Sequence, residues 1–391
     1  MTATLERPES RIEAVHRRRR EQTDRFPRTT AARWLVRLGF FVLFAVQPVL
    51  SAPALAGLNT PNQRLLDRIA AIDWNRADMT WLGDIFPPLS TLIAAGLAWG
   101  GRLALSLFGV AAAAIFLQML LEIMVQRRFP AAIGGVLLVA LSVNPLFAYT
   151  VTENLPAFLG LAFFALGISD VARFFSWGST QSGFRAGLLL MLAVLCDPSA
   201  LLYVAAAAAT APFIRLRRQG QPGARAANLL VIVYPTVAAL AAIIALNLIF
   251  LGRPLAGQAE HLLDGAGDRV SALGQIFTSP DGWLMLASVG SAWLVALVVR
   301  RPQAIAISTL VFGAIVVAFV LGLLPTGSAG NTFILMTTMA AALIPASRSR
   351  GLNLILLFIA VLQIGIAWAS AFSKPVILDW IHALNGALGL A

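Results

Sequence analysis

The sequence predicts an all-α polytopic membrane protein with about eleven transmembrane helices, a cytoplasmic N-terminus and a C-terminus on the outside. Apolar residues make up 59% of the 391 residues and charged residues only 12%, which is about half the charged fraction of a typical soluble chain. The mean hydropathy is +0.81. An ordinary protein interior does not bury this much apolar surface, whereas a bilayer is a solvent for it. In addition, short arginine clusters separate the apolar runs.

The first apolar run follows a polar segment that is too long for an ordinary secretory signal, so we expect a signal anchor that remains as the first span. Later spans follow from the apolar stretches between charged clusters. The predicted spans are 34–55, 101–125, 130–148, 155–172, 184–197, 199–214, 227–251, 282–299, 303–324, 332–346 and 352–372. The pair 184–197 and 199–214 also fits a re-entrant pair, although arginines at both outer ends favour two tight spans.

The arginine clusters decide the predicted orientation. With the N-terminus inside, every even-numbered connection is basic, whereas the odd-numbered connections carry Asp, Glu, His and mixed charges. The basic connections contain Arg127 and Arg128, Arg173 and Arg185, Arg215 to Arg225, Arg300 and Arg301, and Arg348 and Arg350. Cytoplasmic loops are enriched in Lys and Arg, and one shifted span would break the alternation. Span count and orientation therefore support each other, and we expect the inner (plasma) membrane.

One transmembrane domain accounts for most of the chain. The predicted parts are a disordered basic cytoplasmic tail (1–30), the transmembrane domain (31–372) with outside loops at 56–100 and 252–281, and an outside-facing amphipathic tail (373–391). The net charge of +11 lies largely in the N-terminal tail and the cytoplasmic connections. No basic face suited to nucleic acid remains, so nucleic-acid binding is excluded.

The first outside loop is the most informative segment. Residues 62–73 predict an amphipathic helix at the membrane surface, and Trp74 and Trp81 suit the headgroup belt. The apolar face of this helix holds Leu65, Leu66, Ile69 and Ile72. Asp84 then precedes the turn Pro87-Pro88-Leu89, which holds a carboxylate near the membrane surface, where it can act as a general base. Alternatively, the aspartates of this loop cap short helices.

These features resemble the GT-C superfamily of polyprenyl-phosphate-sugar-dependent membrane glycosyltransferases. The acidic residue and Pro-Pro-Leu turn of the long first outside loop carry the resemblance. So do the segment Asn144–Asn154, with Glu153 opening the fourth span, and the helix end at Asp197-Pro198. Many members have a basic residue before that proline, where this chain has Asp197. The similarity covers roughly residues 30–215 and rests on layout and short motifs.

The resemblance implies transfer of a sugar, with inversion, from a polyprenyl-phosphate donor to a lipid, glycan or protein acceptor on the outer face of the membrane. It maps the base that deprotonates the acceptor hydroxyl to Asp84, beside the Pro-Pro turn, or to Asp78 upstream. Glu153 would bind a sugar hydroxyl or the acceptor, or else stabilise the start of the fourth span.

A lipid-phosphate donor also requires a cation near the outer surface. Arg253 is the best placed in sequence, with Arg269 and Lys374 as alternatives, although each also suits an interface anchor. His261 would join acid–base chemistry or lie in a solvated loop. No dense carboxylate cluster is present, so no metal or other cofactor is predicted, although the two candidate acids would be able to share a divalent cation. The expected partners are a polyprenyl-phosphate-linked sugar, membrane lipids and a membrane or periplasmic protein that helps to recognise the acceptor.

Two other functions remain open, a transporter or flippase of a lipid-linked intermediate and a non-catalytic GT-C-like scaffold in a membrane complex. Few charged residues lie deep in the predicted spans, which argues against an ion-coupled pump. The sequence contains no P-loop. The single cysteine, Cys196, excludes an intramolecular disulfide and is expected to be a small apolar helix residue. The Ala- and Arg-rich composition is typical of a bacterium with a GC-rich genome, and hence of a bacterial cell-envelope protein.

Overall fold

The computed structural model describes residues 26–51, 58–77, 79–126, 131–177, 180–210, 224–254, 263–298, 300, 302–324, 331, 335, 349–387 and 389. Within these ranges every regular element is a helix, as the composition predicts. The elements are α2 (Thr30–Ser51), α3 (Pro61–Ala71), η1 (Thr80–Asp84), α4 (Pro88–Leu97), η2 (Ala98–Gly100), α5 (Gly101–Gln126), α6 (Ala131–Ser142), α7 (Pro145–Glu153), α8 (Leu155–Trp177), α9 (Thr180–Cys196), α10 (Ser199–Ala209), α11 (Ala224–Leu251), α12 (Ala266–Thr278), α13 (Pro280–Val298), α14 (Pro302–Val320), α16 (Arg350–Phe372) and α17 (Pro375–Ala387).

Five helices in the described ranges are long and apolar enough to cross a membrane. They are Thr30–Leu50, Pro88–Gln126, Leu155–Phe174, Ala226–Leu251 and Arg350–Phe372. The number rises to six if α6 and α7, which meet at an angle of 57°, form one bent span. The structure therefore confirms the all-helical class with several potential membrane spans, and five or six helices of the described residues, compared with about eleven predicted spans, are long enough to cross a membrane. Helices α9, α10, α13 and α14 are apolar but shorter, and most of the predicted span 332–346 and most of the predicted tail 1–30 lie outside the described residues.

Prolines divide two of the apolar stretches into separate helices. The predicted span 130–148 is broken at Asn144-Pro145, because proline lacks the N–H that would continue the helix. The Asn144 side chain caps the new helix by accepting hydrogen bonds from the backbone N–H groups of Leu146 and Phe147 at 2.9 and 3.3 Å. The predicted break between α9 and α10 is present, with Cys196 buried as the last residue of α9.

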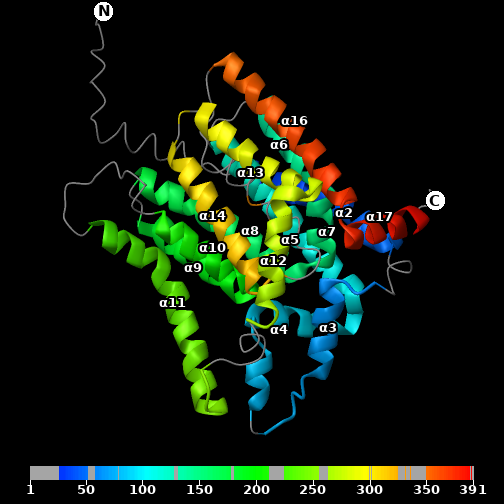
Figure 1. The fold of residues 1–391 in the computed structure, drawn as a ribbon, viewed down its shortest axis with the longest axis vertical. Helices are drawn as coiled ribbons and strands as arrows, with labels where there is room; N and C mark the ends of the chain where they lie inside the picture. The colour runs from blue at the N-terminus through cyan, green and yellow to red at the C-terminus, as the bar shows by residue number, and fades with distance from the viewer. Residues whose placement is uncertain are drawn as a thin grey trace, which may run out of the picture.

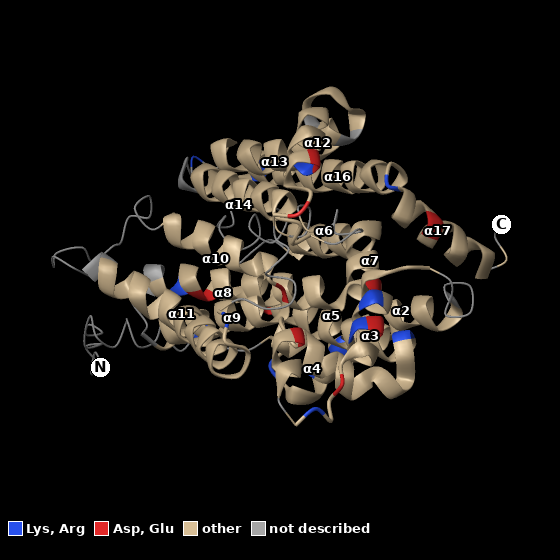
Figure 2. Ribbon diagram, turned by 60° about the horizontal axis from the view of Figure 1, so that its bottom comes forward, with Lys and Arg blue, Asp and Glu red and all other residues tan. Residues whose placement is uncertain are grey.

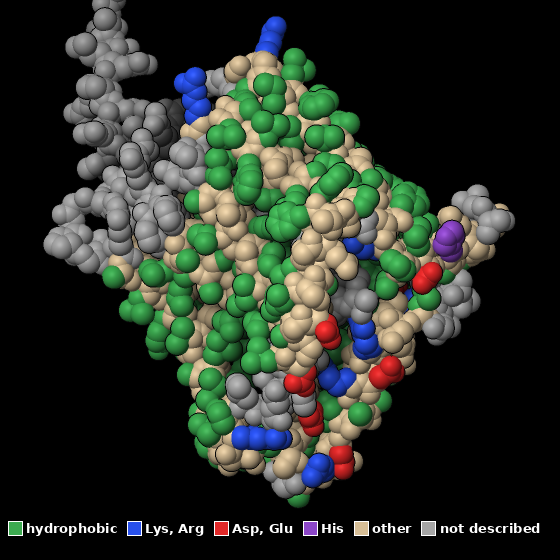
Figure 3. All heavy atoms as spheres, in the orientation of Figure 1, with side chains coloured by type: hydrophobic (Ala, Val, Ile, Leu, Met, Phe, Trp, Pro, Cys, Tyr) green, Lys and Arg blue, Asp and Glu red, His purple; other side chains and the backbone are tan. Residues whose placement is uncertain are grey.

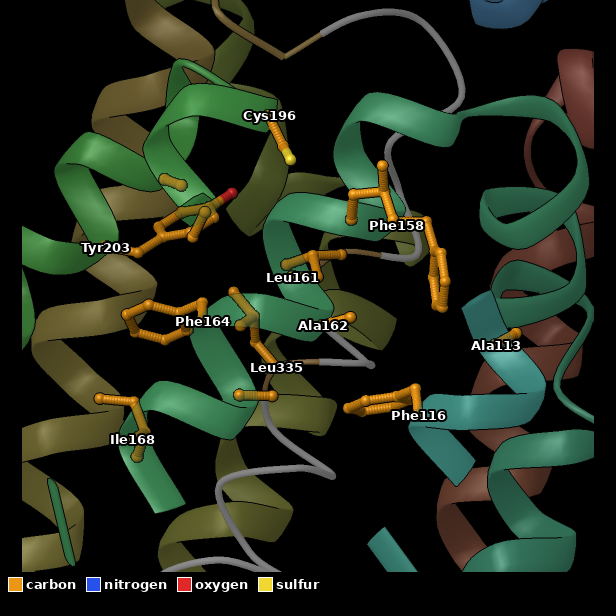
Figure 4. Close-up of a cluster of buried hydrophobic side chains, with 14 of the residues drawn as sticks. Ala113, Phe116, Phe158, Leu161, Ala162, Phe164, Ile168, Cys196, Tyr203 and Leu335 are labelled. Carbon is orange, nitrogen blue, oxygen red and sulfur yellow. The ribbon is translucent and has the colours of Figure 1, made fainter. Parts of the chain in front are cut away.

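Helices α5, α7 and α8 lie inside the bundle, and α11 and α16 run along its outer sides (Figure 1). An aromatic chain connects four helices in this interior: Phe44 of α2 contacts Phe147 of α7, which contacts Phe158 of α8, which contacts Phe116 of α5. The ring centroids are 5.9 to 6.2 Å apart in edge-to-face arrangements. Figure 4 shows Phe116 and Phe158 within the buried cluster, with Phe164 and Tyr203 on its other side.

A polar network joins α2, α5, α8 and α9 at the end of the bundle that the arginine pattern assigns to the cytoplasm. Arg37 donates to the side-chain oxygen of buried Gln118 through Nε and Nη2, at 3.1 and 2.8 Å. Arg173 and Arg185 both pair with the buried carboxylate of Asp170. Arg173 also donates to the side-chain oxygen of Gln126 in α5. The buried Gln118 and Asp170 side chains therefore each have an arginine partner from another helix, and Asp170 avoids the free-energy penalty of an unpaired buried charge.

Helix α5 crosses α7 at close range at Gly109. Gly109 of α5 faces the backbone of Val151, and a methyl group at Gly109 would lie 2.1 Å from the Val151 carbonyl oxygen. Glycine is required there because any side chain would push α7 away. This contact aligns the C-terminal end of α7 with the start of α5.

We expect Gly109→Ala to lower the free energy of unfolding by about 1–3 kcal/mol, because the added methyl overpacks the α5–α7 contact. Gly135→Ala is the matched control, since nothing lies within 4 Å of a methyl group at that helical position. Thermal unfolding in detergent should show a lower midpoint for Gly109→Ala and no loss for Gly135→Ala. Equal midpoints for the two variants would contradict the described contact.

Candidate functional site

The candidate site is built on α3, the amphipathic helix predicted in the first outside loop. Thr60 caps its first turn, with the side chain accepting from the backbone N–H of Gln63 at 3.4 Å. Leu65, Ile69 and Ile72 are buried against the bundle, as the predicted apolar face requires. The remaining faces of α3 carry Asp67, Arg64 and Arg68. Figure 2 shows acidic and basic residues gathered around α3 and the neighbouring ends of α2 and α7.

Asn62 attaches α3 to the break between α7 and α8. Its side chain is fully buried and donates from Nδ2 to the Thr152 carbonyl oxygen at 2.9 Å. Its Oδ1 accepts from the backbone N–H of Leu155 at 2.9 Å. One amide therefore bridges the last turn of α7 and the first turn of α8, where backbone groups lack helical partners. The first outside loop is thus bound to the interior of the bundle by a short, buried contact.

Glu153, the last residue of α7, is buried in an ion pair with Arg102. Arg102 Nε lies 3.0 Å from Glu153 Oε2, and Nη2 donates to Oε1 at 3.3 Å. The Thr60 side chain is also hydrogen-bonded to this carboxylate. One turn along α5 from Arg102, Ser106 donates from Oγ to the Thr152 carbonyl oxygen at 2.6 Å. Arg102, Ser106 and Gly109 thus present one continuous face of α5 to the end of α7.

Asp84 ends η1 with an exposed carboxylate that lies within electrostatic range of Arg68. Burial lowers the pKa of Arg68 from its ordinary value, and the Asp84 carboxylate opposes that shift. Arg68 Nη2 donates to the buried Thr91 hydroxyl of α4 at 2.7 Å. Next to Thr91 on α4, Ser90 donates from Oγ to the Cys196 carbonyl oxygen at 2.8 Å. Helix α4, which follows the turn that carries Asp84, is therefore fixed to α3 and to the end of α9.

Asp197 occupies the position where the resemblance leads one to expect a basic residue. It is buried, and its carboxylate accepts from the Ser199 backbone N–H at 3.0 Å and from the Ser199 hydroxyl at 2.7 Å. These contacts give the side chain a local role at the start of α10.

The other predicted site residues are placed less centrally. Arg253 follows α11 and is exposed. Arg269, on α12, donates from Nε to the Val320 carbonyl oxygen at the end of α14 at 2.7 Å, so it stabilises a helix C-terminus. The predicted base Asp78 and the predicted substrate-binding His261 lie outside the described residues.

Each of the two acidic candidates interacts with a different arginine: Glu153 with Arg102, and Asp84 with Arg68. Asn62 and Arg68 are six residues apart on α3, or about 9 Å along its axis. Asp84 lies near Arg68, and Glu153 lies near Asn62. Over the described part of the chain, no group of three or more His, Cys, Asp or Glu side chains that could hold a metal ion is found. The Arg68 guanidinium is the group here that can bind an anion, and the exposed Asp84 carboxylate is the group that can accept a proton.

Sequence reasoning missed Asn62, Arg68 and Arg102. For Arg102 a signal was available, because an arginine at the start of an apolar run requires an acidic partner, and Glu153 was predicted at the same end of the membrane. Nothing in the sequence pointed to Asn62 or to the proximity of Arg68 to Asp84, since both contacts depend on how the loop folds back.

Surface composition separates this region from the rest of the molecule. Figure 3 shows hydrophobic side chains over most of one face, Lys and Arg at its upper end, and acidic and basic side chains together towards its lower right.

No protein-family model matches the chain, and neither a curated protein nor a solved structure is significantly similar to it.

Breaking the buried pair should destabilise the fold. We expect Arg102→Met to lower the free energy of unfolding by about 3 kcal/mol, because the Glu153 carboxylate is then buried without its partner. Combining it with Glu153→Met should recover much of the loss, whereas Asp67→Ala at an exposed position should change stability by less than about 0.5 kcal/mol. Unfolding in detergent measures wild type, Arg102→Met, Glu153→Met, the double variant and Asp67→Ala. Additive losses in the double variant would show that the pair is not coupled.

Proposed function

We propose that the chain is a membrane glycosyltransferase of GT-C type, which transfers a sugar with inversion from a polyprenyl-phosphate donor to a lipid, glycan or protein acceptor on the outer face of a bacterial plasma membrane. The proposal includes the eleven-span topology with the N-terminus inside. In its support, the predicted apolar runs within the described residues fall on helices, and the run 130–148 falls on the bent pair α6 and α7. No metal or other cofactor is part of the proposal.

The observation that carries the proposal is that the exposed Asp84 carboxylate lies within electrostatic range of the Arg68 guanidinium, which is bound to Thr91 of α4, the helix that follows Asp84. In the proposed reaction Asp84 accepts the proton of the acceptor hydroxyl, and the acceptor oxygen attacks the anomeric carbon of the sugar. The bond from that carbon to the phosphate oxygen breaks, and polyprenyl phosphate leaves with the electron pair. A guanidinium beside the base stabilises the negative charge on the departing phosphate.

Several residues have supporting roles in this proposal. Glu153 and Arg102 hold the wall of the site and are available to a sugar hydroxyl only if their ion pair opens. The exposed Arg253 is a second candidate for the donor phosphate, and Arg269 is a third. Asp78 remains the alternative base, and His261 an alternative proton carrier. A partner membrane or periplasmic protein would supply acceptor recognition that the short loops lack.

The test is sugar transfer by the purified protein in lipid nanodiscs, with radiolabelled polyprenyl-phosphate sugars as donors and a membrane lipid extract as acceptor. Asp84→Asn should lower kcat by at least about 100-fold, the range expected for loss of a general base. Asp67→Asn is the matched control, since Asp67 is an exposed aspartate on α3, and it should retain activity. Arg68→Gln should raise the KM for the donor.

Each other outcome points to a different assignment. Full activity of Asp84→Asn together with loss of activity in Asp78→Asn would move the base to Asp78. Absence of transfer from every donor, together with movement of lipid-linked sugar across vesicle membranes, would replace the enzyme with a flippase. Absence of both activities would favour a non-catalytic scaffold.

A further inference from the structure

Two tryptophan side chains form an aromatic pair at the tip of the first outside loop. The ring centroids of Trp74 and Trp81 are 5.6 Å apart, with the ring planes tilted by 46°. Trp74 is 38% exposed, and Trp81 is partly buried beneath it. The segment between α3 and η1 reaches the lower end of the molecule in Figure 1, away from the helices that enclose the core. A solvent-facing aromatic surface is therefore available without any opening of the bundle.

The helical register places this pair beside the proposed base. η1 is a 3₁₀ helix over Thr80–Asp84, and in such a helix side chains three residues apart lie on the same side. Trp81 and Asp84 are three residues apart, so they share a face of η1 and are separated by about 6 Å along its axis. The aromatic pair and the exposed carboxylate consequently belong to one surface.

Buried residues, packing against α11 and backbone hydrogen bonds fix the shape of this surface. Gly83 and Ile85 are buried on either side of Asp84, and η1 packs against α11. Consecutive backbone hydrogen bonds order the tip, from Arg76 to Asp73, from Met79 to Arg76 and from Leu82 to Met79, with N–O distances of 3.1 to 3.4 Å. A platform that keeps its shape loses little conformational entropy when a ligand binds.

We propose that Trp74 and Trp81 form the platform on which the saccharide part of the acceptor stacks, so that the acceptor hydroxyl is presented to Asp84. The apolar C–H face of a pyranose ring packs on an indole ring, and its hydroxyl groups remain at the edge of the stack for hydrogen bonding. Exposed polar residues border the pair on the chain, with Asp73 and Asn75 on either side of Trp74. The inference rests on the proposed function for the role of Asp84 but not for saccharide binding itself.

The competing role is that of an ordinary headgroup anchor, in which single tryptophans lie at the membrane surface. Trp99 and Trp283 fit that role better, because they are 86% and 60% exposed and neither pairs with another ring among the described residues. Part of the Trp74 ring instead packs against a second indole, and exposed polar residues flank Trp74 on the chain.

The test measures binding and transfer separately. Wild-type protein in nanodiscs is titrated with linear tetrasaccharides of glucose, mannose, galactose and xylose, and binding is followed by calorimetry. We expect at least one tetrasaccharide to bind, and Trp74→Ala and Trp81→Ala to weaken that binding about tenfold or more. Trp74→Phe should retain part of the affinity, and the control variants Trp99→Ala and Trp283→Ala should match wild type. Asp84→Asn should still bind the tetrasaccharide while losing transfer.

The inference is overturned if no tetrasaccharide binds, or if Trp74→Ala binds like wild type while remaining folded by circular dichroism. It is also overturned if Trp99→Ala weakens binding as much as Trp74→Ala, which would indicate a general effect of membrane anchoring. The transfer assay separates these failures from failure of the enzyme proposal. Transfer with an unchanged acceptor KM in Trp74→Ala would reject the platform alone, and tryptophan-dependent binding without any transfer would reject the enzyme alone.

Discussion

The arrangement of the outer end of this molecule depends on the two hydrogen bonds of Asn62. They join α3, which belongs to the first outside loop, to the carbonyl of Thr152 and the N–H of Leu155 at the break between α7 and α8. Without them the Leu155 N–H at a buried helix break would lack a side-chain partner, at a free-energy penalty of about 1–3 kcal/mol, and the Thr152 carbonyl would keep only its bond from Ser106. Because α3 carries Arg68, the same contact sets where the Asp84 turn can lie.

The other polar contacts at the outer end of the bundle depend on the position that Asn62 gives to α3. Once α7 ends under α3, its terminal Glu153 is buried and requires a cation, which Arg102 supplies from the start of α5. Arg102 can reach it because Gly101, with φ of +58°, redirects the chain between η2 and α5. Gly109 then allows α5 to approach α7 closely. A bend, a small residue and an ion pair thus act together, and each is explained by the packing of the same two helices.

The helices of this chain were largely predictable, whereas the contacts between them were not. Apolar runs and arginine clusters located most of the described helices but not α12 (Ala266–Thr278), which lies in the predicted outside loop 252–281. The spacing of Leu65, Ile69 and Ile72 gave the buried face of α3, because burial of an apolar face is a local pattern. The kink at Asn144-Pro145 was missed because an uninterrupted apolar run outweighed a single proline. Asp84 was selected from a local motif, but its neighbour Arg68 lies across a turn whose path no periodicity specifies. Pairing between distant residues is decided by tertiary packing, which the sequence pattern does not record.

The central claim is that the first outside loop is an integral part of the bundle through Asn62. Hydrogen–deuterium exchange of wild type, Asn62→Leu and Asn59→Leu in nanodiscs tests it directly, since Asn59 is a neighbouring exposed asparagine. The claim predicts faster exchange in Asn62→Leu over α3 and over the start of α8, with α13 and α16 unchanged and Asn59→Leu equal to wild type. Unchanged exchange in α3 and α8, or an equal increase throughout the chain, would contradict it.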